Sequence, residues 1–133
     1  MTSNTSRPPV YMIDSEADAL AALALGAEAR LPQVAALLLE EIDRAELRRA
    51  DEMPADVVTM MSTVEFTDEN SGSRRAVQLV YPQEADIAAG RISILTPVGA
   101  GLIGLREGQS IRWPDRDGQE HVLRVLHVRQ PAR

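Results

Sequence analysis

The sequence predicts an α+β protein in which a short antiparallel helical hairpin precedes a small, mainly antiparallel β-sheet that carries one short helix. Apolar residues recur at helical spacing between positions 14 and 49, whereas after Met53 short β-branched runs alternate with turn residues. A chain of 133 residues that is 44% hydrophobic is long enough to bury a core. We expect two regions, a lead-in and hairpin in residues 1–53 and the sheet in residues 54–133.

Two segments joined by a short link predict the hairpin. The first, Asp14–Leu25, has acidic residues in its first turn, where the helix dipole favours them, and is followed by Gly26, a natural helix stop. The second, Leu31–Arg49, has a proline near its first position. Its apolar residues follow the spacing of a coiled-coil seam: Leu31, Ala35, Leu38, Ile42 and Ala45. The facing stripe on the first helix is Ala17, Leu20, Ala21 and Ala24.

Two leucines of the second predicted helix, Leu37 and Leu39, lie off this seam. They either pack against the second half of the chain or form a homodimer face, and the sequence leaves the oligomeric state open. Residues 1–13 are predicted as a flexible or edge-strand lead-in.

β-Branched and aromatic residues predict the strands of the second region. These segments are Asp56–Phe66, Arg74–Tyr81, Arg91–Leu95, Gln109–Trp113 and His121–Val128. The segment Pro82–Gly90 is predicted as a loop with one helical turn, and Asp117-Gly118 is a hairpin signal between the last two strands.

Composition and charge narrow the class of function. The net charge is −6, and residues 1–53 hold ten acids against five arginines. An acidic surface repels phosphate backbones, so we expect no direct nucleic-acid binding; a basic protein surface or a positively charged channel is favoured instead. The chain has no cysteine, which excludes disulfides and thiolate metal sites. Without an N-terminal signal or a membrane-length apolar run, we expect a soluble, cytoplasmic protein.

The stretch TPVGAGLIGL (Thr96–Leu105) contains Gly99, Gly101 and Gly104 at the G-x-G-x-x-G spacing of dinucleotide-binding folds. That fold requires a long helix after the last glycine, but only three residues separate Gly104 from the next glycine. We therefore expect no nucleotide. The stretch is instead predicted as a short helix capped by Thr96, whose glycines permit close approach to the sheet behind it or to a partner's backbone.

No set of residues predicts catalysis, a metal or a cofactor. His121 and His127 share a predicted strand and one of its faces, but six residues place them about 20 Å apart, too far for one metal. An acidic run on the second helix, paired through Glu40 and Arg44, predicts a solvated face or a contact with a basic partner. The run is Glu40, Glu41, Asp43 and Glu46.

The run Ile94–Gly108 resembles the signature of the C-terminal domain of the GreA/GreB transcript-cleavage factors, although Leu-Arg-Glu-Gly stands where that family has Val-Gly-Asp. Within the same superfamily, the chain is more similar to the regulators of nucleoside diphosphate kinase. The similarity covers residues 10–130 and is carried by Asp51–Phe66, Gln78–Pro82 and Ser93–Trp113.

The resemblance implies that residues 54–133 form an FKBP-like antiparallel β-domain that docks on RNA polymerase at the rim of its secondary channel. The family's docking segment corresponds here to Leu95, Thr96, Pro97 and Val98, and the hairpin would point toward the channel. The alternative implied by the resemblance is a non-catalytic interaction module that regulates nucleoside diphosphate kinase or another protein.

The predicted hairpin tip departs from the cleavage factors. Those proteins have a long coiled coil with a pair of acids at its tip that help hold a catalytic metal. Here the tip has one acid, Glu28, close to Arg30. One carboxylate is a weak divalent-metal site and the hairpin is short. We therefore expect a protein that binds polymerase without promoting transcript cleavage and competes with cleavage factors.

Overall fold

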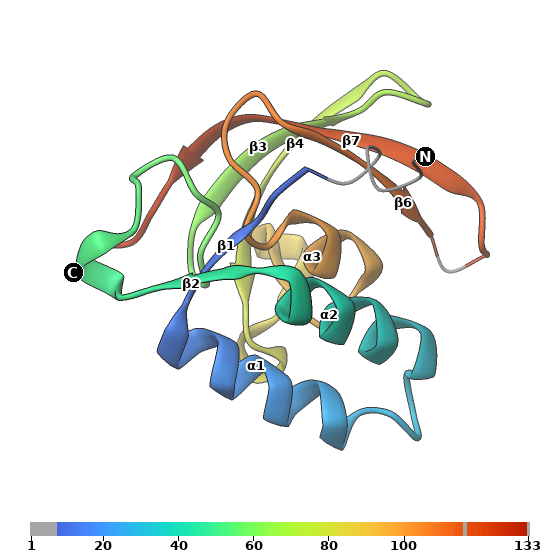
Figure 1. Cartoon of the computed structure of the whole chain (residues 1–133). Coiled ribbons are helices and arrows are strands. Elements are labelled where there is room, and N and C mark those ends of the chain that lie inside the picture. The colour runs from blue at the N-terminus through green and yellow to red at the C-terminus, as the bar shows by residue number, and fades with distance from the viewer. Residues whose placement is uncertain (1–7, 116, 133) are drawn as a thin grey trace, which may run out of the picture.

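A curved β-sheet covers one side of a short central helix, and a helical hairpin covers the other side (Figure 1). The computed structural model describes residues 8–115 and 117–132. The sheet has the strand order β5-β4-β3-β7-β6, with β5 parallel to β4 and the other neighbours antiparallel. Its strands are β3 (Thr63–Asp68), β4 (Ser73–Val80), β5 (Arg91–Ser93), β6 (Ser110–Pro114) and β7 (Glu120–Arg129). The α+β prediction is therefore confirmed.

The hairpin consists of α1 (Asp14–Gly26) and α2 (Pro32–Arg44), which pack against each other as the seam predicts. Leu20 and Leu38 are fully buried between the two helices and the rest of the molecule. Leu37 is also buried in the core, which confirms the prediction that it packs against the second half of the chain. The opposite side of α2 packs on the central helix α3 (Pro97–Leu102).

The second helix ends at Arg44, so the prediction that it continues to Arg49 is wrong. Ala45 has an extended backbone, and the next residues form β2 (Glu46–Arg48), which pairs in parallel with β1 (Tyr11–Ile13). The Glu46 amide also donates to the carbonyl of Val10 at 2.9 Å. These non-local hydrogen bonds outweigh the local helix propensity. Within the predicted lead-in, Tyr11–Ile13 form an edge strand, and residues 1–7 lie outside the described part of the chain.

The first predicted strand begins seven residues late, because β3 starts at Thr63 rather than at Asp56. A tight turn interrupts the β-branched run. The Ser62 hydroxyl accepts the Thr59 amide at 3.0 Å, and Met61 adopts a positive φ of 68°. Val58 instead pairs with the chain after α3, donating to the Leu105 carbonyl at 2.8 Å.

The connection after β4 contains two single-turn 3₁₀ helices, η3 (Pro82–Glu84) and η4 (Ile87–Ala89), where one helical turn is predicted. A further 3₁₀ turn, η2 (Ala50–Glu52), follows β2. Strand β5 ends at Ser93, two residues earlier than predicted, because the chain turns there toward α3.

One hydrophobic core contains residues from both sides of position 53. Leu20 and Leu38 of the hairpin belong to the same cluster as Leu102, Trp113 and Val125. The hairpin therefore forms a layer of the fold, and the sheet does not bury its concave face without it. None of the helices that the structure describes combines the length and apolar character that a membrane crossing requires.

Candidate protein-docking site

The segment before α3 is held by a compact set of hydrogen bonds around Thr96. Its hydroxyl donates to the Ser93 carbonyl at 2.7 Å and accepts the Gly99 amide at 3.1 Å. Pro97 occupies the first helical position, where its missing N–H leaves no intrahelical bond unmade. The predicted N-cap is confirmed, and the helix ends at Leu102.

The glycines of this stretch allow α3 to approach its own domain closely. A Cβ atom on Gly99 would lie 2.4 Å from the Ser93 carbonyl oxygen, and one on Gly101 would lie 3.0 Å from the Trp113 ring. Gly104 has a φ of +85°, and a Cβ there would lie 2.8 Å from the Val10 side chain. Close approach to the sheet is therefore confirmed for Gly99 and Gly101, whereas Gly104 supplies a positive φ and lies against the segment before β1.

The four residues predicted to dock differ in exposure. Leu95 is only 7% exposed and belongs to the hydrophobic core, and Pro97 is also buried. Thr96 and Val98 are half-buried. A partner that approached this segment would therefore contact mainly Thr96 and Val98, because Leu95 packs in the core.

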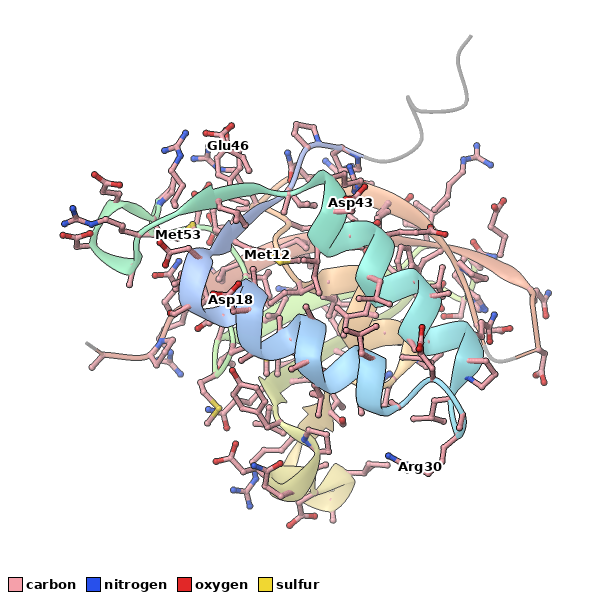
Figure 2. All side chains as sticks on the ribbon, turned by 60° about the horizontal axis from the view of Figure 1, so that its bottom comes forward. Met12, Asp18, Arg30, Asp43, Glu46 and Met53 are labelled. Carbon is pink, nitrogen blue, oxygen red and sulfur yellow. The ribbon has the colours of Figure 1, made fainter. Side chains whose placement is uncertain are left out.

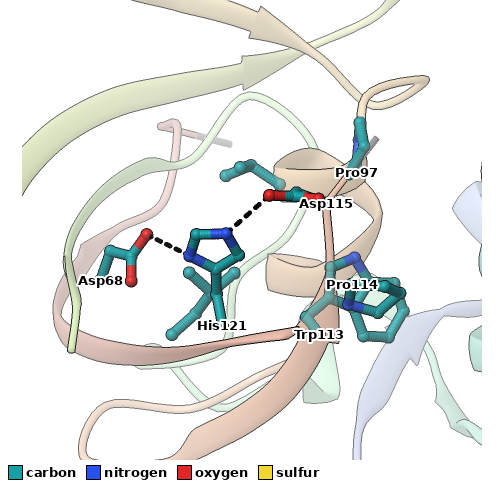
Figure 3. A pocket seen from close by; sticks show the side chains of 8 residues that line it. Asp68, Pro97, Trp113, Pro114, Asp115 and His121 are labelled. Atoms are coloured by element: carbon teal, nitrogen blue, oxygen red, sulfur yellow. Dashed lines mark hydrogen bonds and ion pairs between the residues drawn. The ribbon is translucent and has the colours of Figure 1, made fainter. Parts of the chain in front are cut away.

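Two hollows flank Pro97 and Val98. The first has a volume of about 210 Å³ and is lined by Asp68, Pro97, Val98, Trp113, Pro114, Asp115, His121 and Leu123 (Figure 3). The second is larger, about 480 Å³, and its lining also includes Pro97, Val98 and Asp115. Its remaining lining residues are Arg75, Ala85, Ile87, Ile92, Ser93, Thr96 and Asp117.

His121 lies between two carboxylates in the first hollow (Figure 3). Its Nε2 is 2.8 Å from Asp115 Oδ2, and its Nδ1 is 2.8 Å from Asp68 Oδ2. The Nδ1 contact lies outside hydrogen-bond geometry, and it is an ion pair when the imidazole is protonated. The hydrogen bond to Asp115 and the charge of Asp68 raise the pKa of His121, although partial burial opposes them. The same hydrogen bond, with the Gln119 and Asp117 amides, lowers the pKa of Asp115.

The two histidines do not share a face of β7, so that prediction is wrong. The pairing of β3 with β7 shifts register between Glu65 and Phe66, which leaves Leu126 as an extra residue. The bulge reverses the alternation of side chains. His127 is therefore exposed beside Glu107, whereas His121 lines the hollow.

No cluster of three or more His, Cys, Asp or Glu residues suited to a metal ion occurs among residues 8–115 and 117–132. Asp68 and Asp115 contact different nitrogens of the His121 ring, so the two carboxylates lie on opposite sides of it.

The start of α2 contacts the β6–β7 turn. Gln33, in the first turn of α2, donates from Nε2 to the backbone carbonyl of Asp115 at 3.3 Å. Glu28 and Arg30 are both exposed in the turn between the helices. Figure 2 shows Arg30 at this tip and Asp43 near the opposite end of the hairpin.

The acidic run on α2 is only partly a solvated face. Glu41 is fully buried, and its carboxylate accepts from Arg44 at 2.7 and 3.1 Å. Arg44 also donates to the Pro8 carbonyl at 2.7 Å. The expected pairing of Arg44 with Glu40 is therefore corrected to a pairing with Glu41. The buried pair fastens the lead-in to the hairpin, while Glu40 and Asp43 face solvent.

Sequence reasoning missed the charged residues that surround the docking segment. Asp68, Arg75 and His121 come from three different strands, and only the sheet register brings them near Val98. The hairpin signal at Asp117-Gly118 was the one local indication that a turn lies here.

Fold and site together define a small α+β domain with a capped helix, two hollows and charged residues around them. Comparison with known proteins shows the family to which this domain belongs. The family described as "Transcription elongation factor, GreA/GreB, C-term" matches residues 53–130. "Regulator of nucleoside diphosphate kinase" from Escherichia coli is 40% identical over 124 residues, which cover 92% of this chain and 90% of that protein.

Two further relatives support the assignment. A solved "Prokaryotic transcription elongation factor GreA/GreB from Nitrosomonas europaea" superposes with a TM-score of 0.71 at 35% identity, over 90% of this chain and 98% of that one. "Transcription elongation factor GreA" from Azorhizobium caulinodans is 40% identical over 74 residues, which are 56% of this chain and 47% of that protein. The chain belongs to the GreA/GreB family, and it is a transcription-related regulator.

Proposed function

We propose that this protein binds RNA polymerase at the rim of the secondary channel through the segment Leu95–Val98, without promoting transcript cleavage. The observation that carries the proposal is the position of Val98, half-buried on a rigid, capped helix start between two hollows. A partially exposed apolar side chain in a concave, preorganised setting can be covered by a partner at little cost in conformational entropy. Membership of a family of transcription elongation factors supports polymerase as the partner.

The hairpin supports binding without cleavage. Helix α1 has 13 residues, so it is only about 20 Å long. Its tip has the single carboxylate of Glu28, and Gln33 ties the start of α2 to the β6–β7 turn. A catalytic Mg²⁺ needs several oxygen ligands, which one acid at the end of a short hairpin does not supply. A protein that occupies the docking rim without these ligands competes with cleavage factors.

Retention of core RNA polymerase on the immobilised full chain tests the docking segment. We expect the wild type to retain polymerase and Val98→Arg to weaken binding at least about tenfold, as loss of a central apolar anchor does. Val98 is a better probe than Pro97, because Pro97 is buried and an arginine there would disturb folding. The matched control is Leu47→Arg: Leu47 is 51% exposed on β2 and lines neither hollow. Equal retention of both variants would refute the docking segment.

Cleavage of RNA in backtracked elongation complexes tests the second half of the proposal. We expect no acceleration when the protein is added alone, and slower cleavage when it is added with a cleavage factor. Acceleration by this protein, lost in Glu28→Gln, would show that one tip carboxylate suffices and would overturn the proposal.

The name of the Escherichia coli relative favours a second candidate, a non-catalytic module that regulates nucleoside diphosphate kinase. The same immobilised chain tests it, with purified kinase in place of polymerase. Retention of the kinase but not of polymerase would favour this alternative.

A further inference from the structure

The hollows on both sides of Val98 carry an unequal charge. Three carboxylates line them: Asp68 at the end of β3, and Asp115 and Asp117 at the β6–β7 turn. Among the residues that the structure describes, the cationic groups in the same lining are Arg75 and His121. Between these described residues the excess is negative even when His121 is protonated. Asp115 and Asp117 both line the larger hollow.

Hydrogen bonds fix the position of Asp115. Its Oδ1 accepts the backbone amides of Asp117 and Gln119, each at 2.9 Å, and its Oδ2 contacts His121. The carboxylate is thereby oriented before any partner arrives, which lowers the entropic cost of using it in recognition. Asp117 is exposed on the same turn and lines the larger hollow.

Apolar side chains also line the larger hollow. Ile87 of η4 is 83% exposed, an unusual state for a large aliphatic residue, and it lines this hollow with the half-buried Val98. Arg75 is also part of the lining, and its guanidinium carbon lies 5.7 Å from the centre of the Phe66 ring. This contact holds a cation against the sheet, so the hollow combines negative groups, apolar side chains and a positive group.

We infer that the partner segment bound here carries a lysine or arginine that lies beside Asp115 and Asp117 and an apolar side chain that packs on Ile87 and Val98. The inference rests on the proposed function and specifies the chemistry of the polymerase surface that this site accepts. The guanidinium of Arg75 repels a basic side chain, which favours placing that side chain beside Asp115 and Asp117. An acidic surface around a desolvated apolar side chain affects the orientation of the partner and the association rate more than it affects the affinity.

Binding of the full chain to core RNA polymerase, measured by fluorescence anisotropy, tests the charge requirement. The chain has no native cysteine, so a single engineered cysteine on its exposed surface takes the dye. We expect Asp117→Arg to raise Kd about tenfold at low salt and to flatten the decrease of affinity with salt. Asp43→Arg makes the same charge change on exposed α2, outside both hollows, and should change Kd less than about twofold.

A second pair of variants tests the apolar requirement. Ile87→Ser should raise Kd about fivefold, whereas Leu25→Ser, at a residue 57% exposed on α1, should leave it unchanged. Fluorescence of Trp113, the single tryptophan, checks that each variant is folded.

The outcomes separate the two proposals. If wild-type protein binds no polymerase, the proposed function is wrong and this inference falls with it. If wild type binds polymerase and Val98→Arg does not, docking through this segment stands. If Asp117→Arg then has the same Kd as Asp43→Arg, the basic partner segment is refuted. Tighter binding by Asp117→Arg would assign an acidic partner segment and would likewise overturn the inference.

Discussion

Replacing Gly99 by alanine gives the sharpest test of how α3 is seated. The added Cβ would lie 2.4 Å from the Ser93 carbonyl oxygen and 3.1 Å from the Cα of Ile94. Both are backbone atoms, so neither can move aside by changing a rotamer. The Thr96 hydroxyl holds both Ser93 and the Gly99 amide, which prevents local relaxation of the turn. Either β5 or α3 has to shift.

Two opposing effects set the size of the change. Alanine favours a helix over glycine by about 1 kcal/mol, which lowers the cost of the substitution. Overpacking in a closely packed core costs about 1–3 kcal/mol, and the backbone contact places this site at the upper end. We expect Gly99→Ala to lower the free energy of unfolding by about 2 kcal/mol.

Urea denaturation followed by Trp113 fluorescence measures this change, because the ring packs directly against α3. The matched control is Gly26→Ala at the last residue of α1, where a Cβ meets no atom within 4 Å. That variant gains helix propensity without a clash and should be up to about 1 kcal/mol more stable. If Gly99→Ala were as stable as Gly26→Ala, the close approach of α3 to β5 would be wrong.

Two further predictions concern charged groups. Arg44→Ala removes the guanidinium that contacts buried Glu41 and the Pro8 carbonyl, and it should lower the unfolding free energy by about 2–3 kcal/mol. Arg49→Ala, in an exposed pair with Asp51, should cost less than about 0.5 kcal/mol, and equal losses would contradict the buried pair. Folding raises the pKa of His121, so protonated His121 stabilises the folded state. This stabilisation is fully present below the pKa of histidine in the unfolded chain, about 6.5, and it disappears as pH rises through the pKa in the folded protein. The stability difference between wild type and His121→Gln should therefore be largest near pH 6 and shrink toward pH 9 in urea titrations; a constant difference would show that protonation of His121 does not matter.

Local signals predict much of this fold. The spacing of Leu31, Ala35 and Leu38 identifies the hairpin, and Thr96-Pro97 identifies the start of α3. These features depend on residues a few positions apart, so helix periodicity and capping chemistry are enough to find them.

The errors occur where distant segments decide the outcome. Residues 46–48 leave the helical pattern because β1 supplies backbone partners, and no local feature of the sequence encodes that pairing. Likewise, the bulge at Leu126 reverses the side-chain alternation of β7 and separates the two histidines. The charges around Val98 come together only through the sheet register, so the sequence predicted a docking segment at Leu95–Val98 without the charged residues that surround it.

The packing of α2 on α3 limits how this architecture could be altered. Turns added at the exposed tip, between Glu28 and Arg30, would extend into solvent and leave the contact of Gln33 with the β6–β7 turn in place. Replacing the whole hairpin is different, because Leu20 and Leu38 share one core with Leu102. Chimeras that exchange residues 1–53 with another family member should therefore fold poorly without matched changes in the sheet.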